Sequence, residues 1–409
     1  METYFDKEFF AGNRLRLREL FTGTAPIVIT ANGQLQKSAD EAYPFTQDKN
    51  FWYLTGCGVA DALLVIDKDK EYIILPARSN VQDIFDGSIA PETIQNISGV
   101  SAVYDAKEGY RQLNNRLKKV KHAATVAAPP AYIEVYGMHT NPARARLVAH
   151  IKDQNPNVEL LDVRDHLARL RSVKQPLELE AIKQAIAVTG KGLKLVTRQS
   201  SLAKYTYEYE VEADLARFFA KEQSEHAFEP IIAAGKRATI IHNPDRNGEL
   251  TRNDLLLFDV GARMHEYAAD ISRTIAPGEP TKRQQAIHNA VSEVQDYAFS
   301  LLGPGITIRD YEQQVVLFMG EKLRELNLIK TIENDEVRKF FPHATSHFLG
   351  LDTHDLGDYD RPLEPGMVLT VEPGIYVSDE AIGVRIEDDI LITETGVENL
   401  SADLTRTLQ

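Results

Sequence analysis

The stretch LLLFDVGARMHEYAADISRT, residues 255–274, sets two aspartates in apolar, strand-like runs on either side of a short polar segment. Short apolar runs bounded by polar residues are typical of paired strands. A two-residue turn at Met264 and His265 would place Asp259 directly opposite Asp270. Residues paired across a hairpin point to one face, with Cβ atoms about 4.5–5.5 Å apart. Two carboxylates held so closely repel each other, so the stretch favours a bound counter-ion.

The same pattern returns in VLTVEPGIYVSDEAIGVRIEDDILIT, residues 368–393. A turn centred on Asp379 and Glu380 would place Glu372 opposite Glu387. Arg385 would share their face, because side chains alternate along a strand. Convergent carboxylates joined by a histidine suit Mn²⁺, Co²⁺ or Zn²⁺, and not a thiolate-type zinc site. Four such carboxylates balance the charge of two divalent ions, which favours a two-metal site with ions about 3.5–4 Å apart.

Histidines gather in SHFLGLDTHD, residues 346–355, which carries His347 and His354. His343 precedes His347 by four residues. Taken alone, the stretch fits a surface loop with ordinary polar residues, and the spacing of His343 and His347 fits one exposed face of a helix. The two carboxylate pairs favour a metal site over a surface loop, because imidazole and carboxylate ligands together bind divalent ions. The stretch therefore favours at least one histidine ligand at the same site.

Composition narrows the class of protein. The chain of 409 residues has 46 basic and 60 acidic residues, a formal charge of −14. This balance argues against a nucleic-acid or anionic-membrane partner, since both need a basic surface. The single cysteine, Cys57, excludes a disulfide framework and indicates a reducing compartment. The start METYFDKEFF lacks the pattern of a signal peptide, and no apolar run approaches the roughly 20 residues that span a bilayer. We therefore expect a cytoplasmic protein.

The length predicts two or three domains. Residues 25–31, 62–68 and 71–77 are short β-rich runs, and residues 8–21 have helical spacing, which predicts an α/β domain with a mixed sheet. Pro176 favours the first turn of a helix, so a second domain should begin just before it. We expect a first domain over residues 1–170 and a second over residues 171–409. The long helices expected in the second domain cover residues 207–223, 282–302 and 308–326.

The stretches FDVGARMHEYAADISRT, SHFLGLDTHD, VEPGIY and GVRIEDDI together resemble the pita-bread metallopeptidases, specifically the aminopeptidase P and prolidase group. These enzymes remove an N-terminal residue that precedes proline. SADEAYPFTQDKNFWYLTG, residues 38–56, resembles the aminopeptidase P side of the group. The resemblance covers nearly the whole chain. It implies an N-terminal α/β domain with a mixed sheet, contributing to substrate access and assembly, followed by a C-terminal pita-bread (creatinase/aminopeptidase-like) α+β catalytic domain.

Roles for single residues follow from this resemblance. His242 lies in TIIHNPD, where Asn243 stands in place of the usual aromatic residue, and the context of His343, PHATSH, departs from the usual HGLSH. Asp270 and Glu387 would bridge two ions, and Glu372 would act as general base. The implied metal ligands are Asp259, Asp270, His347, Glu372 and Glu387. The implied catalytic residues are His354, Glu372, His242 and Arg385, and the implied substrate-binding residues are His242, His343, His354, Tyr376 and Arg385.

The implied activity is that of a Xaa-Pro aminopeptidase with two divalent ions, Mn²⁺ first and Co²⁺ or Zn²⁺ as alternatives. A metal-activated hydroxide would attack the bond before proline, whose nitrogen carries no hydrogen. The partners implied are peptides with proline in the second position and further copies of the chain, as a dimer or tetramer. Prolidase, which accepts only dipeptides, is the alternative enzyme; methionine aminopeptidase lacks the N-terminal domain. A non-catalytic binding protein of the same fold would be expected to have lost ligands.

Overall fold

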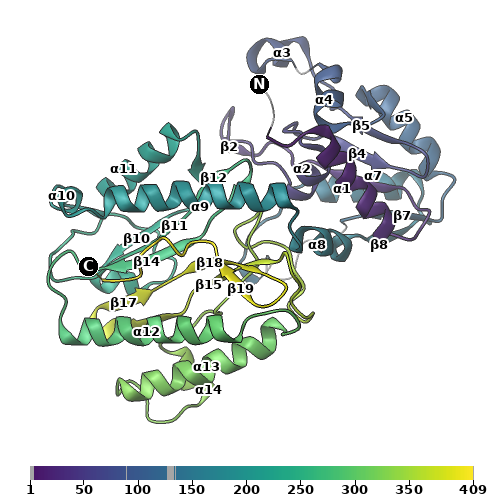
Figure 1. Ribbon diagram of the computed structural model, residues 1–409. Coiled ribbons are helices and arrows are strands. Elements are labelled where there is room, and N and C mark those ends of the chain that lie inside the picture. Colours follow the sequence, from purple (N-terminus) through teal and green to yellow (C-terminus); the bar gives the residue numbers. More distant parts are fainter. Residues whose placement is uncertain (1–3, 89, 127–132, 134, 409) are drawn as a thin grey trace. The chain divides into compact units, whose positions relative to one another are not determined.

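The computed structural model describes residues 4–88, 90–126, 133 and 135–408. The chain divides into two compact units, Met1–Leu170 and Arg171–Gln409 (Figure 1). Each unit has its own hydrophobic core and is described separately.

A six-stranded sheet forms the centre of the first unit, in the order β6-β5-β4-β1-β7-β8. β1 is antiparallel to β4 and parallel to β7, so the predicted mixed sheet is confirmed. The apolar run of β1 is buried along its whole length, because helices cover the sheet. Its strands are β1 (Ile27–Thr30), β4 (Leu63–Ile66), β5 (Glu71–Ile74), β6 (Ala102–Tyr104), β7 (His122–Thr125) and β8 (Glu159–Asp162), with β2 (Gln36–Ser38) and β3 (Glu41–Ala42) in a separate hairpin.

Side-chain caps define where several helices of this unit begin. Asp6, Asp48 and Asp105 accept hydrogen bonds from backbone N–H groups in the first turns of α1, α2 and α5. Such caps satisfy donors that a helix start leaves open. The helices are α1 (Lys7–Leu20), α2 (Lys49–Thr55), α3 (Asn80–Asp86), α4 (Pro91–Ser98), α5 (Ala106–Leu117), α7 (Ala143–Gln154) and α8 (Arg164–Ser172).

Helices in the second unit agree with the sequence. Pro176 is the first residue of α9, where its missing N–H costs nothing. The three long helices that we expected are confirmed, with ends within two residues of the expected positions. The helices are α9 (Pro176–Val196), α10 (Gln199–Leu202), α11 (Glu208–Lys221), α12 (Lys282–Leu301), α13 (Ile308–Glu325) and α14 (Asn334–Arg338).

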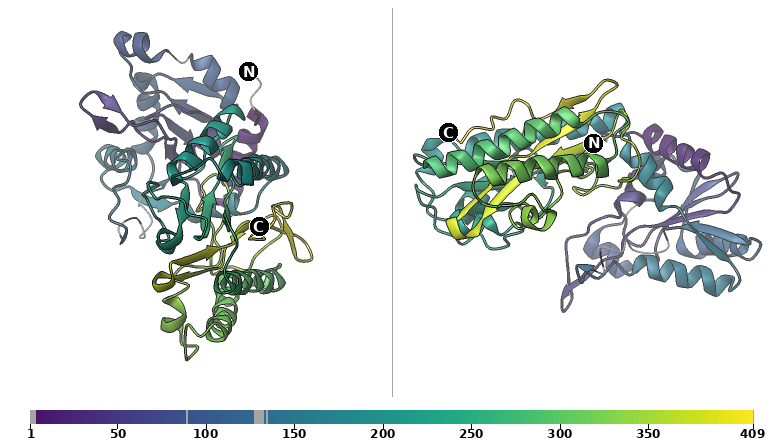
Figure 2. Two further views of the ribbon diagram at one scale, coloured as in Figure 1. Left: turned by 90° about the vertical axis from the view of Figure 1, so that its left-hand side faces the viewer. Right: turned by 90° about the horizontal axis from the view of Figure 1, so that it is seen from below.

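The strands of this unit lie between α9 and α11 on one side and α12 and α13 on the other (Figures 1 and 2). They form small antiparallel sheets, in the orders β10-β11-β14, β13-β12-β9, β15-β18-β19 and β16-β17. The strands are β9 (Glu225–His226), β10 (Ile231–Ala234), β11 (Leu256–Val260), β12 (Ala262–Met264), β13 (Tyr267–Ala268), β14 (Ile271–Ile275), β15 (Val368–Val371), β16 (Gly374–Val377), β17 (Ile382–Arg385), β18 (Asp388–Ile392) and β19 (Val397–Asn399).

The register predicted for the first hairpin was wrong. Asp259 pairs with Ser272 and not with Asp270, because the turn lies at His265 and Glu266, one residue later than expected. Both turn residues have positive φ, 50° and 75°, a conformation that Gly or Asn normally marks. Gly261 permits this register, since a Cβ there would lie 1.8 Å from the carbonyl oxygen of Ala269. Moving the turn by one residue shifts each partner by two, so the two aspartates stay on one face as diagonal neighbours.

The register predicted for the second hairpin is confirmed. Gly374 pairs with Arg385 in one ladder, and Val371 pairs with Asp388 in the next. Glu372 and Glu387 lie between these two ladders at matching positions. The connection is a short 3₁₀ turn, Ser378–Glu380, followed by Ala381 in the left-handed conformation.

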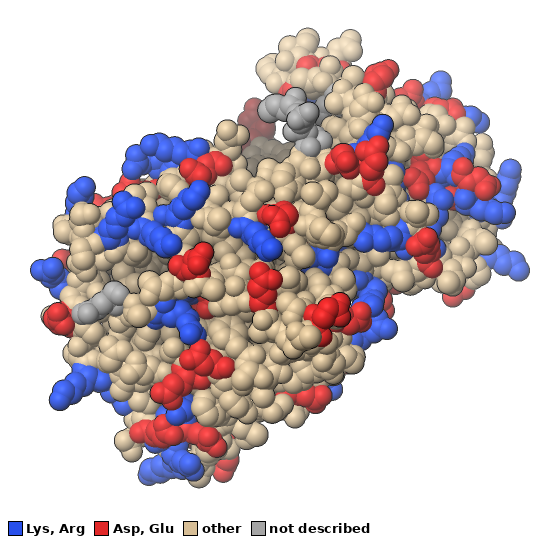
Figure 3. Space-filling model, in the orientation of Figure 1, with Lys and Arg blue, Asp and Glu red and all other residues tan. Residues whose placement is uncertain are grey.

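The surface of the second unit mixes charges. In Figure 3 its basic and acidic side chains are interspersed on the face drawn. The coloured residues of this face therefore offer no continuous basic surface of the kind that nucleic acids require. Over the described part of the chain, no helix combines the length and the apolar character needed to cross a membrane.

Candidate metal centre

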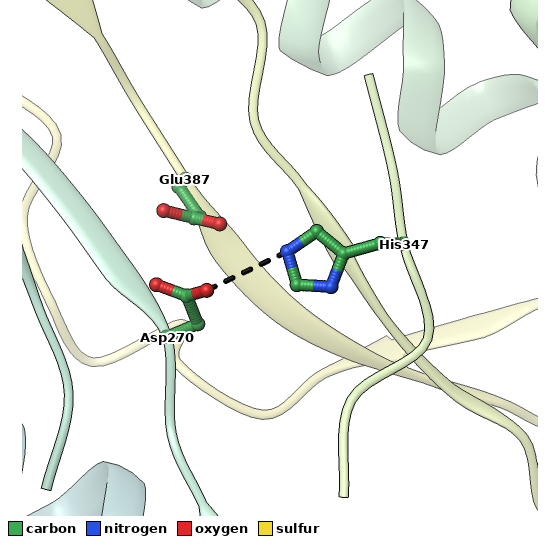
Figure 4. Close-up of side chains that lie close together, drawn as sticks. All are labelled: Asp270, His347 and Glu387. Carbon is green, nitrogen blue, oxygen red and sulfur yellow. Dashed lines mark ion pairs between the residues drawn. The ribbon is translucent and has the colours of Figure 1, made fainter. Parts of the chain in front are cut away.

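Three residues from separate segments meet in the second unit. Asp270 precedes β14, Glu387 precedes β18, and His347 lies in the segment ahead of β15. One ligand atom from each falls within 4.8 Å of the others, and their side chains point to a common centre (Figure 4). All three are largely buried. Glu372, directly after β15, joins them, because its Oε1 lies 3.3 Å from His347 Nε2.

The hydrogen bonds of His347 determine which of its nitrogens can bind a cation. Its Nδ1 lies 3.0 Å from the carbonyl oxygen of Phe348, which can only accept, so Nδ1 carries the hydrogen. Burial lowers the pKa of His347 to about 3, and the ring is therefore neutral at pH 7. Its Nε2 lone pair then faces Asp270 Oδ2 at 3.5 Å and Glu372 Oε1 at 3.3 Å. A lone pair facing two ionised carboxylates is repulsive, so the arrangement needs either a bound cation or a proton on one of the carboxyl groups.

The properties of the carboxylates also favour a bound cation. Burial and then the neighbouring Glu387 raise the pKa of Asp270 well above its ordinary value. Burial raises the pKa of Glu372 to about 8, and burial together with Glu372 and Asp259 raises the pKa of Glu387. Within the described residues, Oδ1 of Asp259 and Oδ1 of Asp270 are buried without a hydrogen-bond partner. Buried carboxylate oxygens with one imidazole are a donor set that fits divalent cations.

Arg385 organises the edge of this cluster. It is 2 % exposed and donates to Asp259 Oδ2 at 2.6 Å and to Ser272 Oγ at 2.8 Å. Ser272 in turn donates to Glu387 Oε2 at 2.7 Å. Ser272 was not among the residues predicted from the sequence, although it follows Asp270 by two residues and strand alternation places both on one face.

A chain of hydrogen bonds continues from Arg385 to His343. Arg385 Nη1 donates to the Tyr376 hydroxyl oxygen at 2.6 Å, and this hydroxyl lies 2.8 Å from His343 Nε2. His343 Nδ1 lies 2.9 Å from the carbonyl oxygen of Ala344 and must donate to it. Nε2 is then the acceptor for the Tyr376 O–H. Burial lowers the pKa of His343 to about 3, which keeps this direction of donation at neutral pH.

The remaining two histidines lie at the margin of the cluster. The ring centroid of His354 lies 4.3 Å from that of His347. His242 is exposed, and its repulsion contributes to lowering the pKa of both His343 and His354, after burial. The structure thus links the other predicted site residues by contacts, whereas His242 is connected to them only by its charge interaction with His343 and His354.

Residues 180–394, more than half of the chain, match the family described as metallopeptidase family M24, and residues 10–126 match the aminopeptidase P N-terminal domain. The chain belongs to metallopeptidase family M24. The Xaa-Pro aminopeptidase of Haemophilus influenzae is 31% identical to it over 97% of this chain and 94% of that protein. The Xaa-Pro aminopeptidase of Escherichia coli is 30% identical, over 98% and 95%.

Solved structures of family members agree with the fold. Aminopeptidase P from Escherichia coli with the inhibitor Pro-Leu superposes with a TM-score of 0.84 at 29% identity, covering 99% of this chain and 97% of that one. Membership in a metallopeptidase family and the cluster around His347 together identify the chain as a metal-dependent hydrolase. The pita-bread fold expected for the second unit is confirmed.

Proposed function

We propose that the chain is a Xaa-Pro aminopeptidase with two divalent ions in its second unit. The observation that carries the proposal is the neutral His347, whose Nε2 lone pair faces the carboxylates of Asp270 and Glu372. The residues that would hold the ions are Asp259, Asp270, His347, Glu372 and Glu387. Mn²⁺ is our first choice because oxygen ligands predominate, with Co²⁺ and Zn²⁺ as alternatives.

Ions bound there supply Lewis acidity and lower the pKa of a water molecule towards neutrality. The chain supplies the rest. Glu372 holds and moves the proton that the attacking water loses and the departing nitrogen gains. Arg385 holds Asp259 and, through Ser272, the carboxylate of Glu387 in fixed directions.

Substrate contacts are assigned to the histidines at the margin. We place His354 and His242 beside the scissile bond, where they would orient the peptide and stabilise negative charge on its carbonyl oxygen. His343 and Tyr376 would form one wall for the proline, with Tyr376 held in place by Arg385. An E. coli relative is solved with Pro-Leu, a dipeptide that begins with proline. We infer that the same class of peptide binds here.

The role of the first unit, the assembly of the chain and its location in the cell are also proposals. The match to an aminopeptidase P N-terminal domain supports a role for the first unit in substrate access and in assembly, as a dimer or tetramer. The single cysteine supports a cytoplasmic location. The prolidase alternative is not favoured, since the full-length relatives are named Xaa-Pro aminopeptidases.

The test compares alanine release from Ala-Pro-Ala and Ala-Ala-Ala by protein loaded with Mn²⁺. We expect release from Ala-Pro-Ala and little from Ala-Ala-Ala. The matched control is Glu372→Gln, which keeps the size of the side chain and removes its ability to accept a proton. Equal release from both peptides would contradict proline specificity, and full activity in the variant would contradict the role of Glu372.

A further inference from the structure

A buried ion cluster lies next to His354 and has no part in the chemistry described above. Asp355, the following residue, is 6 % exposed. Its Oδ1 accepts from Arg171, and its Oδ2 lies 3.3 Å from Lys174 Nζ. The side chains of Arg171 and Lys174 are 2 % and 0 % exposed. One carboxylate therefore pairs with two buried basic side chains from a segment more than 180 residues away in sequence.

The cations are themselves held firmly. They lie where α8 ends and α9 begins, and the backbone of this connection is bonded to the residues directly before β15. Val173 forms a bridge with Met367, and the Lys174 N–H donates to the Gly366 carbonyl oxygen at 2.9 Å. Arg171 also pairs with Asp352 at 2.7 Å, in the loop that leads to His354. The ion cluster is therefore held in place by backbone and side-chain contacts within the second unit.

The loop carrying His354 is connected to the metal centre through the carbonyl oxygen of Phe348. The carbonyl oxygen of Phe348 accepts from the Asp355 N–H at 2.8 Å and also from His347 Nδ1 at 3.0 Å. The same carbonyl that sets the tautomer of His347 therefore anchors the residue after His354. Between these bonds, the ring of His354 is placed 4.3 Å from that of His347, centroid to centroid.

We propose that Arg171 and Lys174 are positioning residues that act through Asp355 to hold His354 at the substrate. The inference rests on the proposed function of His354. Buried ion pairs seldom add net stability over well-packed apolar side chains, but they impose direction through charged hydrogen bonds. Here both oxygens of Asp355 are held by cations, so the backbone of His354 has little freedom to turn. A displacement of about 1 Å beside a reacting group can lower turnover about 100-fold.

The experiment is a double-mutant cycle on kcat with Ala-Pro-Ala and Mn²⁺. Asp355→Asn keeps the shape of the side chain and removes its charge. In the native background it should lower kcat about 100-fold, with metal content unchanged. In the His354→Ala background it should cause little further loss, because the group that it positions is gone. Lys174→Met, which leaves the Arg171 pair intact, should follow the same pattern with a smaller effect and serves if Asp355→Asn fails to fold.

The control is Arg14→Met in the first unit, which breaks a partly buried pair, Arg14 with Glu71 at 2.6 Å. Its effect on kcat, whatever its size, should be the same in both backgrounds. Equal losses from Asp355→Asn in the two backgrounds would show a general structural role and overturn the positioning proposal. A His354→Ala variant with native kcat would instead overturn the proposed role of His354, on which the inference depends. The two failures are therefore distinguishable.

Discussion

Removing the metal should make the stability of the second unit depend on pH in an unusual direction. In the metal-free protein, burial raises the pKa of Glu372 from 4.5 to about 8. Above pH 6.5 the unfolded chain has already lost this proton, whereas the folded chain still holds it. The folded state then binds more protons, so the free energy of unfolding falls as pH rises.

The size of this change in the free energy of unfolding can be calculated for Glu372 alone. One pKa unit corresponds to about 1.36 kcal/mol, so Glu372 alone lowers the free energy of unfolding by about 1.5 kcal/mol between pH 6.5 and 8. Asp270 and Glu387, with pKa values raised in the same direction, add to the fall. For a domain of this size, about 1.5 kcal/mol corresponds to a Tm lower by roughly 3–6 °C.

Histidines act in the opposite direction and in a lower pH range. His343 and His347 have pKa values lowered to about 3 and stay neutral in the folded chain. In the unfolded chain they take up protons below about pH 6.5, so their contribution to stability is lost as pH falls through that range. As the pH rises above about 6.5, the unfolded chain also keeps these histidines neutral, so the slope there is set by the carboxyl groups. This separation makes the interval from pH 6.5 to 8 the informative one.

The assay is thermal unfolding by circular dichroism at pH 6.5, 7.25 and 8, after exhaustive chelation and again with saturating Mn²⁺. Tm should fall with pH only in the metal-free protein, because bound ions keep the carboxylates ionised throughout. Glu372→Gln without metal should show a smaller fall, since its share has been removed. A flat or rising metal-free Tm, or an equal fall with Mn²⁺ present, would refute the reasoning.

The remaining predictions concern the metal, the histidines and the substrate. Purified protein should bind about two divalent ions per chain by elemental analysis and lose peptidase activity to a chelator, and activity that survives complete removal would rule out the mechanism. His347→Ala should lose metal and activity together, whereas His354→Ala should keep its metal and lose turnover; equal metal loss in both would contradict the assigned roles. Because the connection between Glu372 and Arg385 is short, kcat/KM for Ala-Pro-Ala should at least equal that for Ala-Pro, and turnover of the dipeptide alone would favour prolidase.

Strand periodicity explains what could be read from the sequence. Arg385 ends β17, and Glu372 and Glu387 lie between the paired strands of the second hairpin, whose turn is short. Alternation along the chain predicted their common face, and the structure confirms the register. The helix beginning at Pro176 and the long helices after it were predicted for a similar reason, because their apolar residues recur at helical spacing over many turns.

The first hairpin shows where this kind of reasoning fails. No glycine or asparagine marks the turn, and His265 and Glu266 adopt positive φ instead. The sequence therefore offered no signal for choosing between adjacent turns. The error was limited, because a one-residue displacement of the turn preserves the face on which Asp259 and Asp270 lie. Tertiary contacts, with Gly261 against the facing carbonyl, select the register that forms.

The site histidines that lie in loops follow no sequence periodicity. Their placement depends on contacts that a single sequence does not display. His347 is bonded to the carbonyl oxygen of Phe348, which also accepts from the N–H of Asp355, and the partners of Asp355, Arg171 and Lys174, lie in a distant segment. The carboxylates owe their positions to strand geometry and the histidines to hydrogen bonds between side chains and loops. Changes to the loop contacts should therefore affect histidine geometry and turnover while the carboxylates stay together. For that reason metal content and kcat need to be measured separately in every variant of this site.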